Sequence, residues 1–245
     1  MRNIRFGVEY DGTDFAGWQR QPGGKVTVQG VLEGVLSQIL QERVNLAAAG
    51  RTDRGVHARH QVVSLVTGSA MDAGRLVHSV NALLPHSVRV FDGEVVPEGF
   101  HARHSARRRE YRYRLLNRRS ALEGRFAGFV PGVVDRGALD VVAKLVVGEH
   151  DFSAFCRQQR DDRDARVCRV AWCGWRAEGE VLVLDVAADR FLRSMVRYLV
   201  DAMVRVGQGR LEVDVVRRML DGVTGLAQLT PAPASGLFLW RVGYD

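Results

Sequence analysis

IRFGVEYDGTDFAGWQRQPGGKVTVQGVLEGVLSQIL, residues 4–40, contains the signals of a strand, a loop and a helix in succession. Residues 4–10 alternate apolar and polar side chains with period two, which is typical of a β-strand. Residues 11–24 are rich in glycine and aspartate and indicate a loop. Residues 28–40 place their apolar side chains on one helical stripe, with Thr27 as a suitable N-cap. The stretch therefore predicts a strand that leads through a long loop into a helix.

The same rhythm continues to about residue 100. QVVSLVT at 61–67 predicts a strand, and a helix is expected over 72–83 because Pro85 stops it. Residues 87–96 again have the pattern of a strand. The first hundred residues therefore predict the order β, α, β, α, β.

The second part of the chain has a similar alternation. On the strand predicted at 110–117, Tyr111, Tyr113 and Leu115 share one face. Asp135 is expected to cap one helix, and Gly207 is expected to be the C-terminal cap that follows another. The further predicted elements are a helix at 136–147, strands at 167–175 and 180–187, helices at 191–206 and 211–221, and a strand at 236–244.

The strands are mostly amphipathic, and no glycine-rich phosphate fingerprint follows any of them. This favours an α+β fold, with a mixed or antiparallel sheet covered by helices on one face. The two similar halves suggest two subdomains, 1–105 and 106–245. The chain shows no apolar run of membrane-spanning length and no signal peptide, so we expect a cytoplasmic protein without a membrane partner.

The charge of the chain is unevenly distributed. The net charge is +7, and residues 101–119 alone hold eight arginines and one glutamate. This cluster is typical of a stripe that faces nucleic-acid phosphates. The three cysteines form no C-x-x-C pair, which argues against a disulfide framework and against a zinc site.

Four segments carry the residues suited to chemistry, and each is ambiguous alone. Asp53 in GRTDRG has the pattern of a turn, and the aspartates of the DGTD loop could be loop carboxylates. The histidines at 57, 60, 101 and 104 could ligate a metal, but phosphate or backbone contacts are commoner for such pairs. The segments are YDGTDFAGWQRQP at 10–22, AGRTDRGVHARHQVV at 49–63, FHARHSARRREYRYRL at 100–115 and FLRSMVRYLV at 191–200.

In their order along the chain and their amino-acid sequences, these segments resemble the family of tRNA pseudouridine synthases that modify uridines at positions 38 to 40. The resemblance runs from Phe6 to Tyr244 and includes NALLP at 81–85, GEHDFSAF at 148–155 and PAPASGL at 231–237. It implies two ferredoxin-like subdomains that share a mixed, largely antiparallel sheet, with the active cleft between them. It also implies a homodimer that binds the anticodon arm of tRNA.

The implied reaction detaches uracil at N1, turns it and reattaches it through C5, which requires no cofactor and no metal. By the resemblance, the catalytic residues are Asp53, Arg197 and Tyr111: Asp53 is the carboxylate, Arg197 pairs with it, and Tyr111 stacks on the target base and is a candidate for taking the C5 proton. Arg51 is a candidate for filling the space left by the flipped nucleotide. Phosphate contacts are expected from Arg103, Arg107, Arg108 and Arg109.

The sequence departs from the family pattern at several positions. Arg54 follows Asp53 where a small residue is usual, and Glu110 precedes Tyr111. Asp189 replaces a usual Asn, and Asp201 replaces a usual Gly. The segment 157–166 is also more charged than expected.

Two other functions are compatible with parts of the sequence. A magnesium-dependent nuclease or phosphatase could use Asp11, Asp14 and Asp53 as ligands, and a chelator would then abolish activity. A non-catalytic tRNA-binding module would keep its function after Asp53→Ala. Neither alternative accounts for all four segments.

Overall fold

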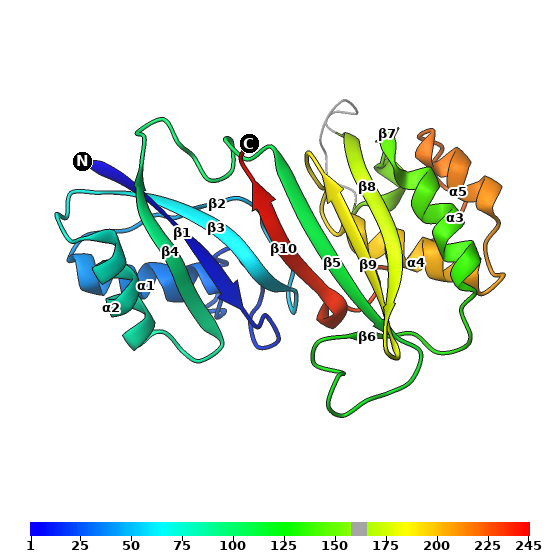
Figure 1. Cartoon of the computed structure of the whole chain (residues 1–245), viewed down its shortest axis with the longest axis horizontal. Coiled ribbons are helices and arrows are strands. Elements are labelled where there is room, and N and C mark those ends of the chain that lie inside the picture. The colour runs from blue at the N-terminus through cyan, green and yellow to red at the C-terminus, as the bar shows by residue number, and fades with distance from the viewer. Residues whose placement is uncertain (158–165) are drawn as a thin grey trace. The chain divides into compact units, whose positions relative to one another are not determined.

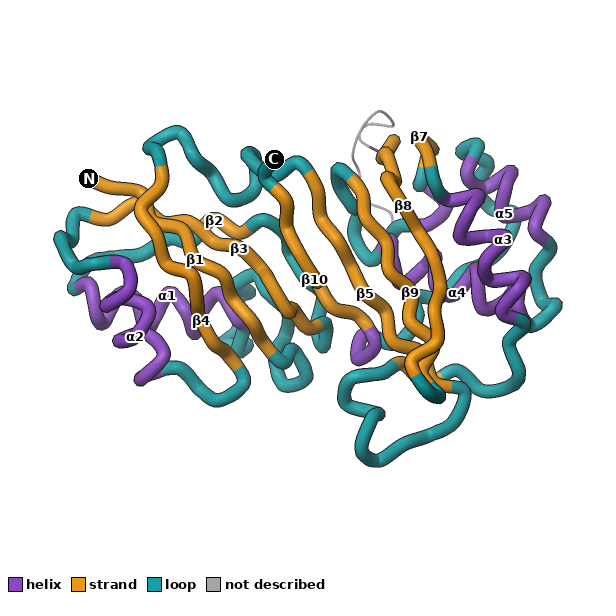
Figure 2. Tube along the Cα trace, in the orientation of Figure 1, coloured by secondary structure: helices purple, strands orange, loops and turns teal. Residues whose placement is uncertain are grey.

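The computed structural model describes residues 1–157 and 166–245, and most of the charged segment 157–166 lies outside the described residues. The described residues form ten β-strands and five α-helices, so the predicted α+β class with a mixed sheet is confirmed. The chain divides into two compact units, Met1–Arg107 with Phe238–Asp245, and Arg108–Leu237. Figures 1 and 2 show their strands and helices.

The sheet of unit 1 has the order β4-β1-β3-β10, and β2 pairs with the same β3. β10 joins β3 in parallel, whereas the pairs β1–β3, β1–β4 and β2–β3 are antiparallel. The bounds are β1 Arg2–Tyr10, α1 Val28–Leu40, β2 Ala47–Ala48, β3 His57–Thr67, α2 Ala73–Leu83, β4 Val88–Val96 and β10 Leu237–Gly243.

In unit 1, α1 begins at the predicted residue, and α2 begins one residue after the predicted start, with Asp72 as its N-cap. The Thr27 side chain accepts a hydrogen bond from the Gly30 amide at 3.2 Å, and Asp72 accepts one from the Arg75 amide at 3.0 Å. Helix α2 packs against α1 and against β4, where Gly93 leaves room for the Val77 side chain. Figure 1 shows both helices beside the blue and cyan strands of this unit.

The sheet of unit 2 has the order β5-β9-β8-β7, and the short β6 pairs in parallel with β5. Its other pairs are antiparallel. The bounds are β5 Arg108–Leu116, β6 Gly128–Phe129, α3 Arg136–Val146, β7 Gly148–Asp151, β8 Val167–Glu178, β9 Val181–Ala188, α4 Met195–Gly207 and α5 Val213–Leu220. Two 3₁₀ turns, Ser153–Phe155 and Ala234–Gly236, complete the regular elements among the described residues.

Two predictions at the ends of α4 are wrong. The sequence predicts a helix from residue 191, but α4 begins at Met195 because Ser194 adopts a left-handed backbone with φ 60°. Gly207 is predicted to follow the helix, but it is the last helical residue and Gln208 is the C-cap. Gly207 packs so closely on Val134 that a side chain there would collide with it.

The compact units differ from the predicted subdomains at the end of the chain. The predicted boundary between 105 and 106 places the last strand in the second subdomain. In the structure, Phe238–Asp245 lies with unit 1, because Phe238 and Leu239 on β10 pair with His57 and Ala58 on β3. The shared sheet and the cleft between subdomains stay predictions.

Candidate active site

The loop that carries Asp53 joins β2 to β3 in unit 1. It is fastened to the loop after β1: the Trp18 amide donates to the Thr52 carbonyl at 3.1 Å, and the Tyr10 hydroxyl lies 2.7 Å from Thr52 Oγ1. A turn follows, because the Val56 amide donates to the Asp53 carbonyl at 3.2 Å. Asp53 itself is half-buried, so it is partly accessible to solvent, while hydrogen bonds hold the main chain of its loop.

Two glycines of the upstream motifs allow these loops to touch. Gly17 has φ 110°, and an added Cβ would lie 3.0 Å from the Thr52 carbonyl oxygen. At Gly12, an added Cβ would overlap the Val56 carbonyl. Glycine is required where main chains approach this closely or adopt a positive φ. The YDGT and AGWQ motifs therefore support the Asp53 loop through their backbone.

His57 is a buried link between the same two loops. Its Nδ1 accepts a hydrogen bond from the Gly12 amide at 3.0 Å and lies 3.2 Å from Asp11 Oδ1. The two contacts are alternatives, because a neutral Nδ1 accepts from Gly12 and a protonated Nδ1 donates to Asp11. The ring also stacks on Phe238, with the centroids 4.7 Å apart. His57 thus contributes to the packing of the Asp53 loop.

Tyr111 lies on β5 in unit 2, on the inward face. This confirms the predicted face, since Tyr111 is 9% exposed and Tyr113 and Leu115 are buried beside it. The Phe191 ring meets the Tyr111 ring edge-on, with centroids 4.9 Å apart and planes at 78°. Phe191, which lies before α4, therefore packs against the tyrosine.

Arg197 lies in the first turn of α4, in the same unit as Tyr111. Its Nε donates to the Ala232 carbonyl at 2.6 Å, and the Ala232 amide donates to the Arg197 carbonyl at 3.1 Å. Because Nε–H lies in the guanidinium plane, this bond helps to orient the whole group. The PAPASGL segment at 231–237 thus holds Arg197.

Tyr113 supports the same segment from the sheet. Its hydroxyl donates to the Pro233 carbonyl at 2.9 Å. Burial raises the pKa of the Tyr113 phenol far above its usual value, so the group remains a hydrogen-bond donor. Gly128 and Gly236 pack against its ring, where a Cβ would collide. Sequence reasoning gave Tyr113 only a core position, because its partner is a backbone carbonyl that no residue type signals.

The candidate RNA-binding arginines are distributed over both units. Arg103 and Arg107 belong to unit 1, and their side chains are exposed, as is that of Arg51 beside Asp53. In unit 2, Arg108 Nε lies 3.1 Å from Glu110 Oε1, and Arg109 Nη1 donates to the Asp189 carbonyl at 2.8 Å.

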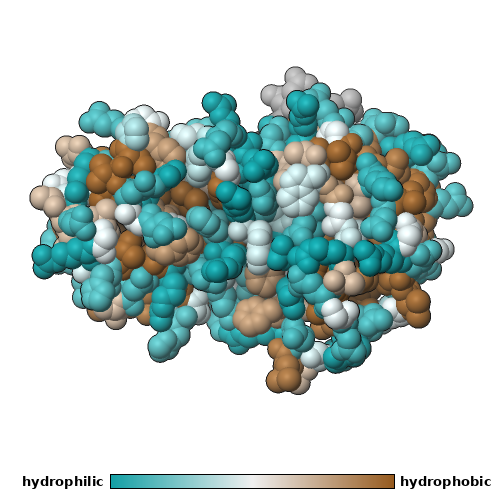
Figure 3. Space-filling model, in the orientation of Figure 1, coloured by the Kyte–Doolittle hydropathy of each residue, from teal (hydrophilic) through white to brown (hydrophobic). Residues whose placement is uncertain are grey.

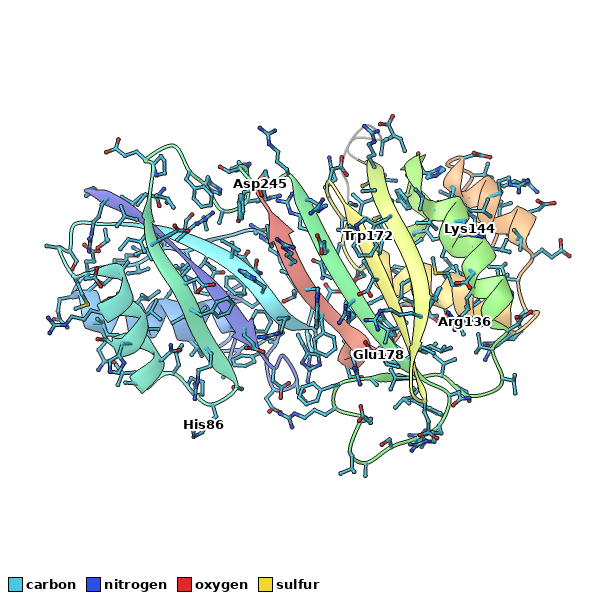
Figure 4. The ribbon with its side chains drawn as sticks, in the orientation of Figure 1. His86, Arg136, Lys144, Trp172, Glu178 and Asp245 are labelled. Atoms are coloured by element: carbon cyan, nitrogen blue, oxygen red, sulfur yellow. The ribbon has the colours of Figure 1, made fainter. Side chains whose placement is uncertain are left out.

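Further along the cluster, the arginines pair with carboxylates of the β8–β9 hairpin. Arg112 contacts both oxygens of Asp185, at 2.6 and 3.3 Å, and Arg114 contacts Glu178 at 3.3 Å. Arg118 is paired with Glu180. Figure 3 shows hydrophilic side chains over these strands, and Figure 4 labels Glu178 at the end of β8. Because these three arginines have acidic neighbours, we expect them to bind phosphate less than the arginines without such partners, and their part in the predicted phosphate stripe stays a prediction.

The unexpected acidic residues also have structural partners. Asp189 Oδ1 accepts from the amides of Arg169 and Arg190, at 3.0 and 2.7 Å, and so closes the ends of β8 and β9. Asp201 on α4 contacts the segment before PAPASGL.

Of the proposed catalytic and base-contacting residues, Asp53 and Arg51 belong to unit 1, and Tyr111 and Arg197 belong to unit 2.

The histidines and carboxylates of the described residues, 1–157 and 166–245, do not gather into a metal site. No group of three or more His, Cys, Asp or Glu side chains there has an arrangement that could hold a metal ion. Nor does this part of the chain contain a helix that is long and apolar enough to cross a membrane. His101 Nδ1 accepts from the amides of Arg103 and His104, which is the backbone role expected of that pair.

Comparisons with known proteins identify the family. The family model described as tRNA pseudouridine synthase matches residues 7–105 and 142–245. The tRNA pseudouridine synthase A of Pelodictyon phaeoclathratiforme is 54% identical over 244 residues, covering 100% of both chains. The protein of that name from Chlorobium limicola is 52% identical with the same coverage. The one from Roseiflexus sp. is 44% identical, covering 100% of this chain and 91% of its own.

A solved structure is also similar in part. A chain of a Cbf5-Nop10-Gar1 complex matches with 14% identity and a TM-score of 0.36, covering 82% of this chain and 45% of that chain. The family rests instead on the sequence matches, which extend over both units. On that evidence, the chain belongs to the tRNA pseudouridine synthase family and is an isomerase.

Proposed function

We propose that this enzyme converts uridine to pseudouridine at positions 38, 39 and/or 40 in the anticodon stem-loop of tRNA, with Asp53 as the catalytic carboxylate. Membership in the family supports the isomerisation of uridine in tRNA. The observation that carries the role of Asp53 is the support of its loop, which two glycines and the Trp18 amide hold from one side. A catalytic group needs such a rigid main chain to keep its direction.

The proposed chemistry requires an ionised carboxylate beside the target base. Asp53 either attacks the uracil ring or the sugar, or it stabilises the charge that develops when the N1 glycosidic bond breaks. The base then turns, C5 bonds to C1′ of the sugar, and any bond to Asp53 breaks. The C5 proton is removed, with Tyr111 as the proposed acceptor, and N1 takes up a proton, so that the product is an isomer of uridine. We propose that Arg197 favours the charged form of Asp53 and that Tyr111 stacks on the base. The edge-on support of Tyr111 by Phe191 suits a ring that has to remain in place.

We propose that the tRNA backbone is bound mainly through phosphates. A target in a helical stem has to leave its stack, which costs a few kcal/mol and is easiest near a loop. Arg103 and Arg107 are suited to offset this cost, since their side chains are exposed. Arg108 already contacts Glu110, and Arg109 already donates to the Asp189 carbonyl. These two arginines would therefore bind phosphate while they keep those contacts. We propose Arg51 as the residue that fills the vacated space.

The reaction is tested on an unmodified tRNA transcript with purified protein. Pseudouridine is mapped by carbodiimide treatment and primer extension, and wild type is compared with Asp53→Asn. Stops in the anticodon arm with wild type and none with the variant are the expected result. No stops on several tRNAs would refute the proposed substrate. Equal stops with both proteins would remove Asp53 from its role.

A homodimer is the second part of the proposal. It rests on the resemblance of the sequence motifs, and membership in a tRNA-modifying family supports a cytoplasmic location, where tRNA is available. Elution mass with and without tRNA is expected to give two copies of the chain. A monomer that modifies tRNA at the full rate would contradict the dimer.

A further inference from the structure

Three side chains of α4 form a stripe that faces an extended segment of the same unit. Arg197, Asp201 and Arg205 are spaced by four residues, so they lie on one face of the helix. Their partners are alternate residues of the segment 228–233, here called the strap. Four helical residues rise about 6 Å and two extended residues about 6.6 Å, so the two spacings match along the whole contact.

The middle and outer contacts involve Asp201 and Arg205. Asp201 Oδ2 accepts the Thr230 amide hydrogen at 2.9 Å, and Arg205 Nη1 donates to the Gln228 carbonyl at 2.9 Å. The two side chains are themselves an ion pair, with Arg205 Nε 3.0 Å from Asp201 Oδ2. The Asp201 side chain is 17% exposed, so water only partly weakens these contacts.

The inner contact is the one that involves Arg197. Ala232 accepts from Arg197 Nε and donates to the Arg197 carbonyl, two residues beyond Thr230 on the strap. A shift of the strap along α4 would therefore move the Ala232 carbonyl away from the guanidinium. The hydrogen bonds that Asp201 and Arg205 make to residues 228–230 oppose such a shift from the helix side.

We propose that Asp201 is a positioning residue, which holds the strap in register so that the Ala232 carbonyl stays on Arg197. Its effect on the reaction rests on the function proposed above, whereas its effect on the strap does not. A residue without an acceptor side chain could neither accept the Thr230 amide nor pair with Arg205, so both contacts depend on the Asp201 carboxylate.

The first test measures the strap without any activity. Hydrogen exchange of peptides that cover 228–236 is compared between wild type and Asp201→Ala, with Asp201→Asn as the conservative variant. Exchange at Thr230 and Ala232 is expected to rise about tenfold or more in Asp201→Ala and less in Asp201→Asn, which keeps one acceptor oxygen. Asp140→Ala is the matched control, because Asp140 forms an i,i+4 pair with Arg136 on α3. It should leave the strap peptides unchanged.

The second test measures the reaction in single turnover. Asp201→Ala is expected to lower the rate about tenfold at unchanged tRNA affinity, because a small displacement of a charged group reduces the rate without removing binding. In an Arg197→Lys background, Asp201→Ala should add little, since a residue that acts through another gives non-additive effects. Asp201→Asn should recover part of the rate.

The outcomes separate the two proposals. Wild-type protein without pseudouridine formation refutes the function, and the exchange experiment then decides the inference alone. An active wild type with unchanged exchange in Asp201→Ala, or with fully additive rate effects, overturns the positioning role. If Asp201→Ala does not fold, Arg205→Gln removes the outer contact and is expected to give the same changes at about half the size on a logarithmic scale.

Discussion

The two units support their candidate residues by different means. In unit 1, the Asp53 loop is held by main-chain atoms: the Trp18 amide bonds to Thr52, and two glycines lie directly against the backbone of residues 52–56. In unit 2, Arg197 is held by its own Nε on the Ala232 carbonyl, and Tyr113 holds the neighbouring Pro233. The first support depends on the absence of side chains, and the second depends on individual donors.

This difference predicts how each support fails. A side chain added to a backbone contact has to displace main chain, so the effect is large and involves the whole loop. Removal of one donor leaves a carbonyl without its partner, which costs less and acts locally. In unit 1, even a small added side chain at these glycines should therefore greatly reduce stability and activity. In unit 2, the loss of one hydrogen-bond donor should reduce them by a smaller amount.

The largest effect is expected from Gly12→Ala. Its Cβ would overlap the Val56 carbonyl, so the Asp53 loop has to move. We expect the free energy of unfolding to fall by about 3 kcal/mol and the single-turnover rate to fall by about 100-fold or more. Chemical denaturation and pseudouridine formation under single turnover measure the two effects.

Gly34→Ala is the matched control in the same unit. Nothing lies within 4 Å of a Cβ at Gly34, which is inside helix α1. Alanine there should raise the free energy of unfolding by about 1 kcal/mol and leave the rate unchanged. A Gly12→Ala protein that is as active as Gly34→Ala would contradict the backbone support.

The next effect tests the donor in unit 2. Arg197→Lys keeps the charge but removes the planar fork, including the Nε that bonds to Ala232. We expect about a 100-fold lower single-turnover rate with little change in tRNA affinity. Arg193→Lys changes an exposed residue before α4 and should alter the rate by less than about twofold. Equal rates for the two variants would argue against a directed guanidinium.

The sequence predicted the helices and strands of each unit, but it did not predict the contacts that hold Asp53 and Arg197 within those units. The apolar period and the Thr27 cap located α1, and Pro85 located the end of α2, because these are signals that side chains carry. The Ala232 carbonyl has no such signal, because every residue carries the same backbone oxygen. The start of α4 was missed for a related reason: Ser194 adopts φ 60° where Phe191 covers Tyr111, and this packing is not local in sequence.

The resemblance supplied what local patterns could not. It identified Asp53 as catalytic in a segment whose pattern is equally typical of a turn. It also selected Tyr111 from a strand face that contains Tyr113 as well. The structure adds the glycine contacts at Gly12 and Gly17, which give the upstream motifs a physical role. Neither the local patterns nor the resemblance predicted the parallel pairing of β10 with β3, because the two strands are far apart along the chain.

A smaller effect is expected from Tyr113→Phe. Removal of the hydroxyl leaves the Pro233 carbonyl without this donor, which should cost about 1–1.5 kcal/mol of unfolding free energy. Because Pro233 is next to Ala232, the single-turnover rate should also fall, by about threefold to tenfold. Tyr244→Phe removes a similar bond in unit 1, to the Ala102 carbonyl at 2.8 Å, and should cost comparable stability while the rate stays the same. The same rate for both variants would separate Tyr113 from the support of Arg197.

The smallest effect compares two kinds of arginine by their salt dependence. Arg103→Gln and Arg107→Gln each alter an exposed side chain of unit 1, so each should weaken tRNA binding and lower the salt slope by about 0.7–0.9 for each phosphate that is no longer bound. Arg112→Gln is the control, because Arg112 already contacts both oxygens of Asp185, a carboxylate that it shares with Arg176 at 3.0 Å. It should reduce the free energy of unfolding by about 1–3 kcal/mol and leave the salt slope unchanged. Filter binding of tRNA over a range of salt concentrations measures the slopes. If Arg112→Gln lowered the slope as much as Arg103→Gln, the paired arginines of the sheet would also bind phosphate, and the contrast between the two sets would fail.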